Sequence, residues 1–215
     1  MEKTETGEPT VVCICGVLAA GKTTLIRSLS GKLTAPALVI FDEYEAFCEW
    51  PDDFAQWIAE GADPACVGNP RLRQDLEALL AGQSIKHPLD ERTISPSSVI
   101  LLEDPFGRTR PDISGLIDLV LFVDLPTDLS VVRMARRALG LDAPPASGDL
   151  SGLANDEILE RVETADRQLN HYAQNRRMYT VLIEPVRSTA DVILDGTKPM
   201  EVMLLEALEA ISQKM

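Results

Sequence analysis

The sequence predicts an α/β fold of three layers, in which a five-stranded parallel sheet lies between helices on both faces. Two observations lead to this prediction. Five short apolar runs alternate with longer segments of helical periodicity, and the runs are apolar throughout rather than at every second position. Strands of that kind are typical of parallel sheets covered on both sides. The 215 residues suit one domain, so we predict a single domain over 1–215.

The predicted strands and helices follow one another along the chain and are separated by loop segments. The strands are TVVCIC (10–15), ALVIFD (37–42), SVILLED (98–104), DLVLFVDL (118–125) and ADVILDG (190–196). Helices are predicted over 23–33, 52–60, 70–81, 126–139, 156–177 and 199–213, because apolar residues recur there at helical spacing. The helix over 126–139 has Pro126 near its start and arginines towards its end, as helix termini favour. The segment 140–155 is rich in Gly, Pro, Ala and Ser, and we predict a mobile loop there.

The stretch GVLAAGKTTL (16–25) fits the phosphate-loop pattern G-x-x-x-x-G-K-[ST]. It follows the first predicted strand and precedes the first predicted helix, which is the context that this motif requires in a P-loop NTPase. Glycines allow the turn and the close approach of backbone N–H groups to phosphates, and the start of the following helix favours anions. We predict that the nucleotide is held by Gly16, Ala19, Ala20, Gly21, Lys22, Thr23 and Thr24. Lys22 is expected to reach the β- and γ-phosphates and Thr23 to contact Mg²⁺.

Acidic residues end two of the predicted strands beside this loop. Ligands of open α/β sheets lie beyond the carboxyl ends of the strands, so these acids are expected near the phosphates. Glu103 is predicted to help hold Mg²⁺, and Asp42 to orient and deprotonate an acceptor hydroxyl. The alternative is that each acid only caps a turn. The neighbouring acids Asp104 and Glu43 leave the choice within each pair open.

Three arginines lie on one face of the helix over 126–139, namely Arg133, Arg136 and Arg137. Cations beside a mobile segment are typical of a lid that neutralises charge and excludes water during phosphoryl transfer. We therefore predict a lid region over 133–161 and an acceptor-binding segment over 43–95. The alternative is that the arginines only stabilise the negative end of their own helix.

Charge and composition exclude several other classes. The net charge is −14, with 34 acidic and 20 basic residues, so no nucleic-acid partner is expected. No apolar stretch is long enough for a transmembrane helix and no signal peptide is evident, so a soluble, cytoplasmic protein without a membrane partner is expected. Cys13 and Cys15 lie on one face of an apolar strand, which predicts core packing rather than a metal site.

Taken together, the motifs resemble the uridine kinase and phosphoribulokinase family of P-loop kinases, from about Val12 to Gly196. Besides the phosphate loop, the resemblance rests on VIFDEY (39–44), LEALLAGQSIKHPLD (76–90), SVILLED (98–104), LVLFVDLPTDLSVVRMARR (119–137) and IEPVRSTADVIL (183–194). The last stretch is close to the family's I-x-P-x-[KR]-x-x-A-D-[IV]-I-[IL] pattern and is the most specific.

The resemblance implies ATP- and Mg²⁺-dependent phosphoryl transfer to a hydroxyl of a small nucleoside- or sugar-like molecule. The catalytic residues would then be Asp42, Lys22, Arg133 and Arg137; Thr23 and Glu103 would hold the metal; and Asp42, Tyr44, Asp90 and Arg136 would bind the acceptor. Association into a homo-oligomer is also compatible with the resemblance.

The acceptor side departs from the family pattern. Uridine kinases of this family carry Pro-x-Tyr-Asp with a downstream His, whereas this chain has Leu89 in place of the Tyr, keeps Asp90, and has no His after it in that stretch. Glu163 replaces the second arginine of the family's Arg-Gly-Arg lid sequence. The sequence therefore supports the kinase prediction more strongly than it supports uridine as the acceptor.

Three alternatives stay open on the sequence. A regulatory GTPase would need N-K-x-D to read guanine, which the chain lacks. A nucleoside-monophosphate kinase would need extra arginines around 45–95, where the chain has Arg71, Arg73 and Arg92. A nucleotide-binding protein without turnover is the third alternative.

Overall fold

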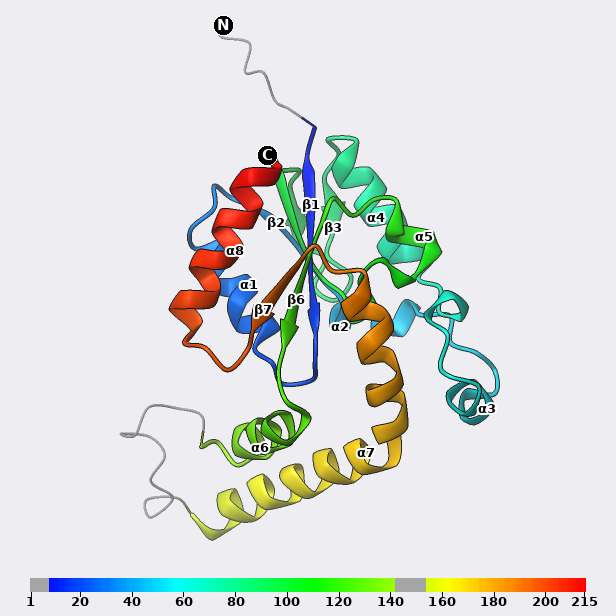
Figure 1. Cartoon of the computed structure of the whole chain (residues 1–215), viewed down its shortest axis with the longest axis vertical. Helices are drawn as coiled ribbons and strands as arrows, with labels where there is room; N and C mark the ends of the chain where they lie inside the picture. The colour runs from blue at the N-terminus through cyan, green and yellow to red at the C-terminus, as the bar shows by residue number, and fades with distance from the viewer. Residues whose placement is uncertain (1–7, 142–153) are drawn as a thin grey trace, which may run out of the picture.

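The computed structural model describes residues 8–141 and 154–215, and its centre is a five-stranded parallel sheet (Figure 1). The strands are β1 (Thr10–Gly16), β2 (Ala37–Ile40), β5 (Val99–Glu103), β6 (Leu119–Asp124) and β7 (Val192–Asp195), in the order β2-β5-β1-β6-β7. Every neighbouring pair in this sheet is parallel. The predicted α/β class and its five strands are therefore confirmed.

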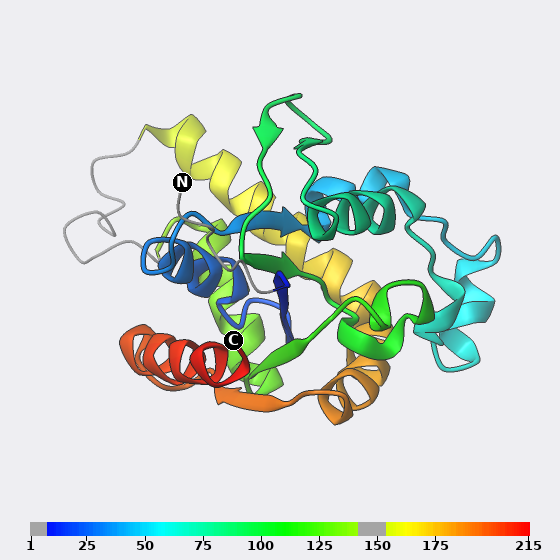
Figure 2. The ribbon, with the colours of Figure 1, turned by 90° about the horizontal axis from the view of Figure 1, so that it is seen from above.

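Helices cover both faces of the sheet, which makes the three layers (Figure 2). One face carries α1 (Lys22–Ser30) and α8 (Met200–Lys214). The other carries α4 (Pro70–Leu80), α5 (Pro111–Ser114) and the last part of α7 (Asn155–Ser188). Residues 11–15 of β1 are 0% exposed because this strand is central and covered on both sides. Cys13 and Cys15 lie there as predicted, and the four cysteines are free thiols.

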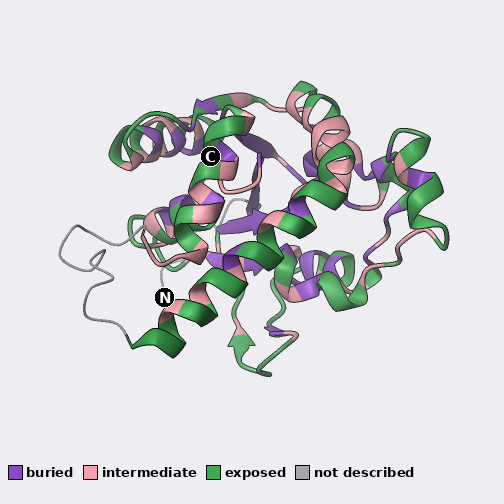
Figure 3. Cartoon of the chain, turned by 90° about the horizontal axis from the view of Figure 1, so that it is seen from below, coloured by how far each residue is buried: buried purple, intermediate pink, exposed green. Residues whose placement is uncertain are grey.

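Two helical segments lie beyond the carboxyl ends of the strands. They are α6 (Thr127–Ala138) and the first part of α7, which crosses below the sheet in Figure 1. Most side chains of this first part are exposed, whereas the strands behind it are buried (Figure 3). The predicted mobile loop over 140–155 falls mainly on residues outside the described ranges, so a lid motion stays a prediction.

The course of α7 differs from the prediction. The helix was expected to end near Arg177, but it continues past Pro185 to Ser188. It bends on the way (Figure 1). The rings of Tyr172 and Tyr179 stack at 5.5 Å, although seven residues of a straight helix rise about 10.5 Å. The part after the bend packs against the sheet, where Val186 is buried, and this packing lets the helix run on through a proline.

The segment 41–95 forms a side unit of short elements. It contains α2 (Phe41–Tyr44), α3 (Phe54–Ala59), the hairpin of β3 (Ile85–Lys86) and β4 (Thr93–Ile94), and the 3₁₀ turns Glu45–Phe47 and Pro64–Cys66. A third 3₁₀ turn, Gly107–Thr109, follows β5. A second apolar cluster joins this unit to the sheet and consists of Phe41, Trp57, Ala62, Val67 and Phe106. Among the described helices, none is long and apolar enough to span a membrane.

Candidate active site

The loop between β1 and α1 has the backbone geometry of an anion cradle. Gly16 has φ +136°, and a Cβ there would lie 2.3 Å from the carbonyl oxygen of Val123, so only glycine fits. Ala19 (φ +55°) and Gly21 (φ +99°) are both left-handed, with Ala20 between them. Alternating left-handed residues turn successive N–H groups towards one side, which makes a nest for an anion. No side chain caps the start of α1 at Gly21, which leaves that end to a ligand.

Not every predicted loop residue faces this cradle. Ala20 is fully buried and its N–H donates to the carbonyl oxygen of Val17 at 3.2 Å, so Ala20 stabilises the loop itself. Thr24 lies on the first turn of α1 with an exposed side chain. In this structure the turn uses the Ala20 N–H, so the role of Ala20 in holding a nucleotide stays a prediction.

Lys22 points back across the loop. Its Nζ donates to the carbonyl oxygens of Gly16 at 3.3 Å and Val17 at 3.1 Å. Burial lowers the pKa of the Lys22 ammonium, and the carboxylate of Glu103 acts in the opposite direction. The amine is thus held at the loop. Burial disfavours its charged form, and a phosphate bound there would favour that form again.

Thr23 and Glu103 come together from α1 and β5. The Thr23 hydroxyl donates to both carboxylate oxygens of Glu103, at 3.2 and 3.0 Å. Burial raises the pKa of Glu103, while Lys22 and the Thr23 hydroxyl oppose that rise. Hydroxyl and carboxylate oxygens are ligands that Mg²⁺ accepts, usually with waters and substrate phosphates completing its shell. No three His, Cys, Asp or Glu side chains of 8–141 and 154–215 gather into a metal site. A few-ligand Mg²⁺ site therefore fits this pair.

The structure separates the two acids that the sequence left open at 103 and 104. Successive residues of a strand point to opposite faces, so Glu103 turns to the loop and Asp104 turns inward. Asp104 is fully buried and pairs with the guanidinium of Arg110. Burial raises the pKa of Asp104 to about 6 despite this cation. Of the two acids, Glu103 is the one that lies at the loop and lines the cavity.

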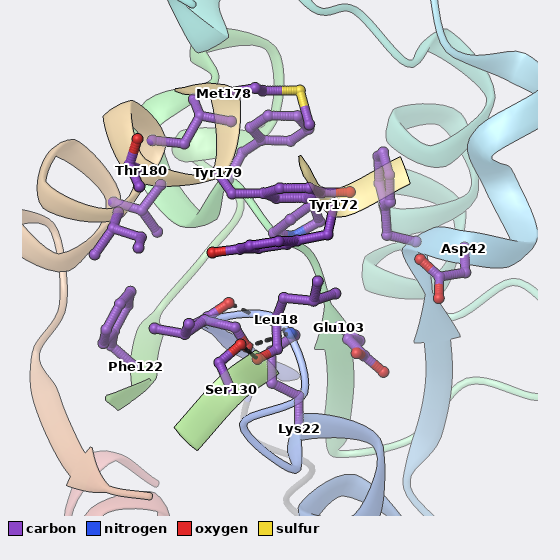
Figure 4. Close-up of a pocket in the computed structure, with 18 of the residues that line it drawn as sticks. Leu18, Lys22, Asp42, Glu103, Phe122, Ser130, Tyr172, Met178, Tyr179 and Thr180 are labelled. Carbon is purple, nitrogen blue, oxygen red and sulfur yellow. Dashed lines mark hydrogen bonds between the residues drawn. The ribbon is translucent and has the colours of Figure 1, made fainter. Parts of the chain in front are cut away.

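A cavity of about 260 Å³ opens beside the loop. Figure 4 shows Lys22, Glu103 and Asp42 along its lower and outer side, with Tyr172 and Tyr179 stacked above them. The strand expected to end at Asp42 ends at Ile40, so Asp42 is exposed on the first turn of α2. The remaining walls come from the loop, the segment 41–50, the turn after β5, β6, α6 and the part of α7 around its bend.

Two predicted acceptor residues lie away from this cavity. Tyr44 is fully buried and its hydroxyl donates to Asp75 at 3.0 Å, so it belongs to the core. Asp90 lies on the hairpin, where its carboxylate is 2.8 Å from Nδ1 of His87. The Nε2 of His87 lies 2.9 Å from Glu43, so this buried histidine joins two acidic side chains. Neither residue lines this cavity and both have structural partners elsewhere, so their contact with an acceptor stays a prediction that this arrangement does not support.

The three arginines predicted for the lid also lie in different surroundings. Arg137 lines a second cavity of about 330 Å³, which also includes Ala19 of the loop. Arg133 instead donates to the carbonyl oxygen of Gly196 at 2.8 Å, and Arg136 donates to that of Leu141. Neither lines the two cavities. Of the three, Arg137 is the one that the structure brings to the loop.

Sequence reasoning missed the contribution of α7. Arg167, His171 and Tyr172 line the second cavity, and Tyr172 and Tyr179 separate it from the first. Arg167 and His171 stand four residues apart and so share a helix face, which was a usable signal. The tyrosine stack depends on the bend of α7, which the sequence pattern did not show.

Comparison with known proteins finds relatives named uridine kinase. No protein-family model matches the chain. The uridine kinase of Oceanobacillus iheyensis is 24% identical over 202 residues, which cover 87% of this chain and 86% of the relative. The uridine kinase of Bacillus cereus (strain B4264) is 25% identical, with 97% of this chain and 98% of the relative covered.

Two solved structures are similar at a lower level. A sugar kinase from Janibacter sp. HTCC2649 is 14% identical with a TM-score of 0.45, covering 95% of each chain. Shikimate kinase from Aquifex aeolicus is 18% identical with a TM-score of 0.40, covering 94% of this chain and 96% of that one. On its sequence relatives, the chain resembles the uridine kinases over most of its length, as its motifs predicted.

Proposed function

We propose that this protein is a Mg²⁺- and ATP-dependent kinase that transfers the γ-phosphate to a hydroxyl of a small molecule. The observation that carries the proposal is the grouping of Lys22, the Thr23–Glu103 pair and Asp42 around one cavity at the phosphate loop. The relatives named uridine kinase support the same class of reaction.

The nucleotide would be held mainly by the backbone. The N–H groups of the left-handed loop and of the first turn of α1 would bind the phosphates, and Lys22 would turn from the loop carbonyls to the β- and γ-phosphates. Thr23 and Glu103 would hold Mg²⁺, whose charge offsets that of the phosphates. In a molecule with a net charge of −14, this local positive site has to attract the anion by itself.

Asp42 would act as the base. In the transfer, the acceptor oxygen forms a bond to the γ-phosphorus, the bond from that phosphorus to the β,γ-bridging oxygen breaks, and the hydroxyl proton passes to the Asp42 carboxylate. The products are ADP and a phosphate monoester. Asp42 suits this role because it is exposed at the cavity and has neither a cap nor an ion pair among the described contacts.

Arg137 would neutralise charge on the transferring phosphoryl group from the other side of the loop. It is the lid arginine that lines a cavity together with Ala19. Closure of the segment over 133–161 would bring further cations and exclude water, which otherwise competes as the acceptor.

The proposal is tested by measuring phosphoryl transfer directly. Purified protein is incubated with Mg²⁺-ATP and a panel of small alcohols, ADP release is followed, and products are identified by mass spectrometry. Asp42→Asn is expected to lower kcat by about 10²- to 10⁴-fold with little change in the KM for ATP, because only proton removal is lost. Lys22→Ala is expected to abolish transfer.

Asp52→Asn is the matched control, since Asp52 is an exposed acid of the same segment that does not line the cavity. It is expected to retain activity within twofold. Equal activity of Asp42→Asn and the unchanged protein would contradict the assignment of the base, and a product without a new phosphoester would contradict the reaction class.

A further inference from the structure

The cavity beside Asp42 has walls that are mainly apolar. Six aromatic side chains contribute, from α2, the loop before α3, the turn after β5, β6 and α7. They are Phe41, Trp50, Phe106, Phe122, Tyr172 and Tyr179. Aliphatic walls come from the part of α7 after its bend. A site lined in this way gains affinity by removing apolar ligand surface from water.

The aromatic walls hold one another in place. Phe41 and Phe106 meet edge to face at 5.7 Å, and Trp50 contacts Phe106 at 6.3 Å. Phe41 and Phe106 also pack on the guanidinium of the fully buried Arg110, at 5.6 and 5.2 Å. Phe41 and Phe106 are 5% and 2% exposed, so this wall is fixed before a ligand arrives. A fixed aromatic wall selects a flat or compact apolar group.

The charges around the cavity are unfavourable for an anionic acceptor. Its charged residues are Lys22 and three carboxylates, those of Asp42, Glu45 and Glu103. Lys22 belongs to the phosphate loop and Glu103 is hydrogen-bonded to Thr23, which leaves Asp42 and Glu45 facing the acceptor space. A phosphate or carboxylate on the acceptor would meet like charge there.

The arginines that a phosphorylated acceptor would need are engaged elsewhere. Arg71 pairs with Asp75, Arg73 with Glu77, and Arg92 lies 3.6 Å from Asp90. None of these three lines the cavity. The acceptor-binding segment therefore supplies no cation to an anionic group in this arrangement.

Few polar groups are left to read a nucleobase or a sugar. No Asn, Gln, Arg or His is among the described residues that line the cavity. Ser130 donates its hydroxyl to the carbonyl oxygen of Leu18 at 2.6 Å, and Thr180 donates to the carbonyl oxygens of Arg176 and Arg177. The other side-chain hydroxyls among the described residues that line the cavity are those of Thr127, Tyr172 and Tyr179. A polyhydroxylated or amide-bearing acceptor has more polar groups than these few hydroxyls can pair, and burying the rest is costly.

We propose that the acceptor is an alcohol with an apolar, aromatic-sized body and no anionic group, whose hydroxyl is presented to Asp42. This inference rests on the proposed kinase function for its reaction, but the binding preference can be measured without turnover. Such an acceptor differs from a nucleoside, because it would be recognised mainly by aromatic contacts rather than by hydrogen bonds.

Three benzyl alcohols with one reacting hydroxyl and different para groups test the proposal. They are 4-methylbenzyl alcohol, 4-(hydroxymethyl)benzylamine and 4-(hydroxymethyl)benzoate, compared with uridine and ribose at pH 7.5. The expected result is a kcat/KM for the methyl compound at least tenfold above those for the benzoate, uridine and ribose. Equal or better use of uridine or of the benzoate would overturn the inference and leave the kinase proposal standing.

Binding separates this inference from the kinase proposal. Isothermal titration calorimetry measures the affinity of the same compounds in the presence of Mg²⁺ and a non-hydrolysable ATP analogue. Trp50→Ala is expected to weaken binding of 4-methylbenzyl alcohol at least fivefold. Phe47→Ala is the matched control, because Phe47 is an exposed aromatic residue of the same segment that does not line the cavity. Such binding without transfer to any alcohol would support the inference and overturn the kinase proposal, whereas no binding of the methyl compound would overturn the inference.

A second variant tests the charge argument. Glu45→Gln removes one carboxylate of the cavity while keeping the shape of the side chain, and Glu45 is exposed, so folding should be unaffected. Its kcat/KM for the benzoate relative to the methyl compound is expected to rise about threefold. Glu60→Gln, an exposed acid of the same segment away from the cavity, is expected to leave this ratio unchanged. No rise with Glu45→Gln would overturn the charge argument.

Discussion

Asp104 and Arg110 form an ion pair with both side chains fully removed from solvent. The pair lies directly behind the aromatic wall of the cavity, since Arg110 packs on Phe41 and Phe106. Two nitrogens of Arg110, Nε and Nη1, are buried without a hydrogen-bond partner among the described residues. Burying such a pair is costly, and removing one partner is costlier because the other charge is then left unpaired.

We predict that Arg110→Met lowers the free energy of unfolding by about 3–5 kcal/mol at pH 7.5. The physical reason is the uncompensated carboxylate of Asp104 inside the protein. Urea denaturation followed by circular dichroism measures the change. The double variant Arg110→Met with Asp104→Asn is expected to recover at least half of the loss, because no buried charge remains. A double variant no more stable than Arg110→Met would show that the ion pair is not the cause.

The carboxyl group of Asp104 is also expected to make the free energy of unfolding depend on pH. Burial raises the pKa of Asp104 to about 6 in the folded protein, above its unfolded value of about 3.9. Between those values the folded state binds more protons, so this group stabilises the fold at low pH and its contribution is lost as pH rises from about 4 to about 6. Denaturation curves across that range are expected to show this loss in the unchanged protein and not in Asp104→Asn. Identical pH profiles would contradict it.

At the scale of elements, α6 and α7 decide what faces the phosphate loop. The helix α6 carries three arginines on one side, yet Arg133 is bonded to the chain after β7 while Arg137 reaches the second cavity. The bend of α7 stacks Tyr172 on Tyr179 beside the loop, and Arg167 of the same helix lines the second cavity together with Arg137. Helix α6 therefore supplies Arg137, and α7 supplies Arg167 and the stacked tyrosine rings that line both cavities.

We predict that Arg137→Ala lowers kcat about 10- to 100-fold, because a charge that stabilises the transferring phosphoryl group is lost. Arg133→Ala is the matched change on the same helix. It is expected to alter kcat less than fivefold and to lower the free energy of unfolding by about 1 kcal/mol, since it removes one hydrogen bond to Gly196. Steady-state ADP release and urea denaturation measure the two effects. The reverse order of kcat losses would assign the catalytic role to Arg133.

At the scale of the whole molecule, the proposed ligand is an anion and the protein itself is acidic. The net charge of −14 would repel a nucleotide at long range, so the proposed affinity would depend on the loop, Lys22 and Mg²⁺. A nucleotide held as proposed would touch β1, α1 and β5 together. Binding should therefore stabilise the folded protein as a unit.

We predict that a non-hydrolysable ATP analogue with Mg²⁺, at 100 times its Kd, raises the free energy of unfolding by about 2.7 kcal/mol. For a chain of 215 residues this corresponds to a rise in Tm of about 5–10 °C. Differential scanning calorimetry measures it. Lys22→Ala at the same ligand concentration is expected to show less than half of the shift, and chelation of Mg²⁺ to reduce it as well. An equal shift in Lys22→Ala would place the nucleotide elsewhere.

Local sequence patterns were enough to predict the sheet and the phosphate loop. The runs of β1, β5 and β6 are apolar on both faces, which only a covered parallel sheet accommodates, and the loop pattern depends on glycine conformations that few other residues adopt. Pairing Thr23 with Glu103 also followed from the sequence, because a loop and the end of a neighbouring strand meet at the same edge of the sheet.

Which side chains face the cavity depends instead on how distant segments of the chain pack together. Tyr44 and Tyr179 are both tyrosines on short or bent helical segments, yet one is bonded to Asp75 in the core and the other lines the cavity. Asp104 and Glu103 are adjacent acids with opposite environments. Local patterns fix which face of an element a residue occupies, but what that face meets depends on contacts between segments far apart in the chain. The bend of α7 over the phosphate loop is such a contact, and it closes the site.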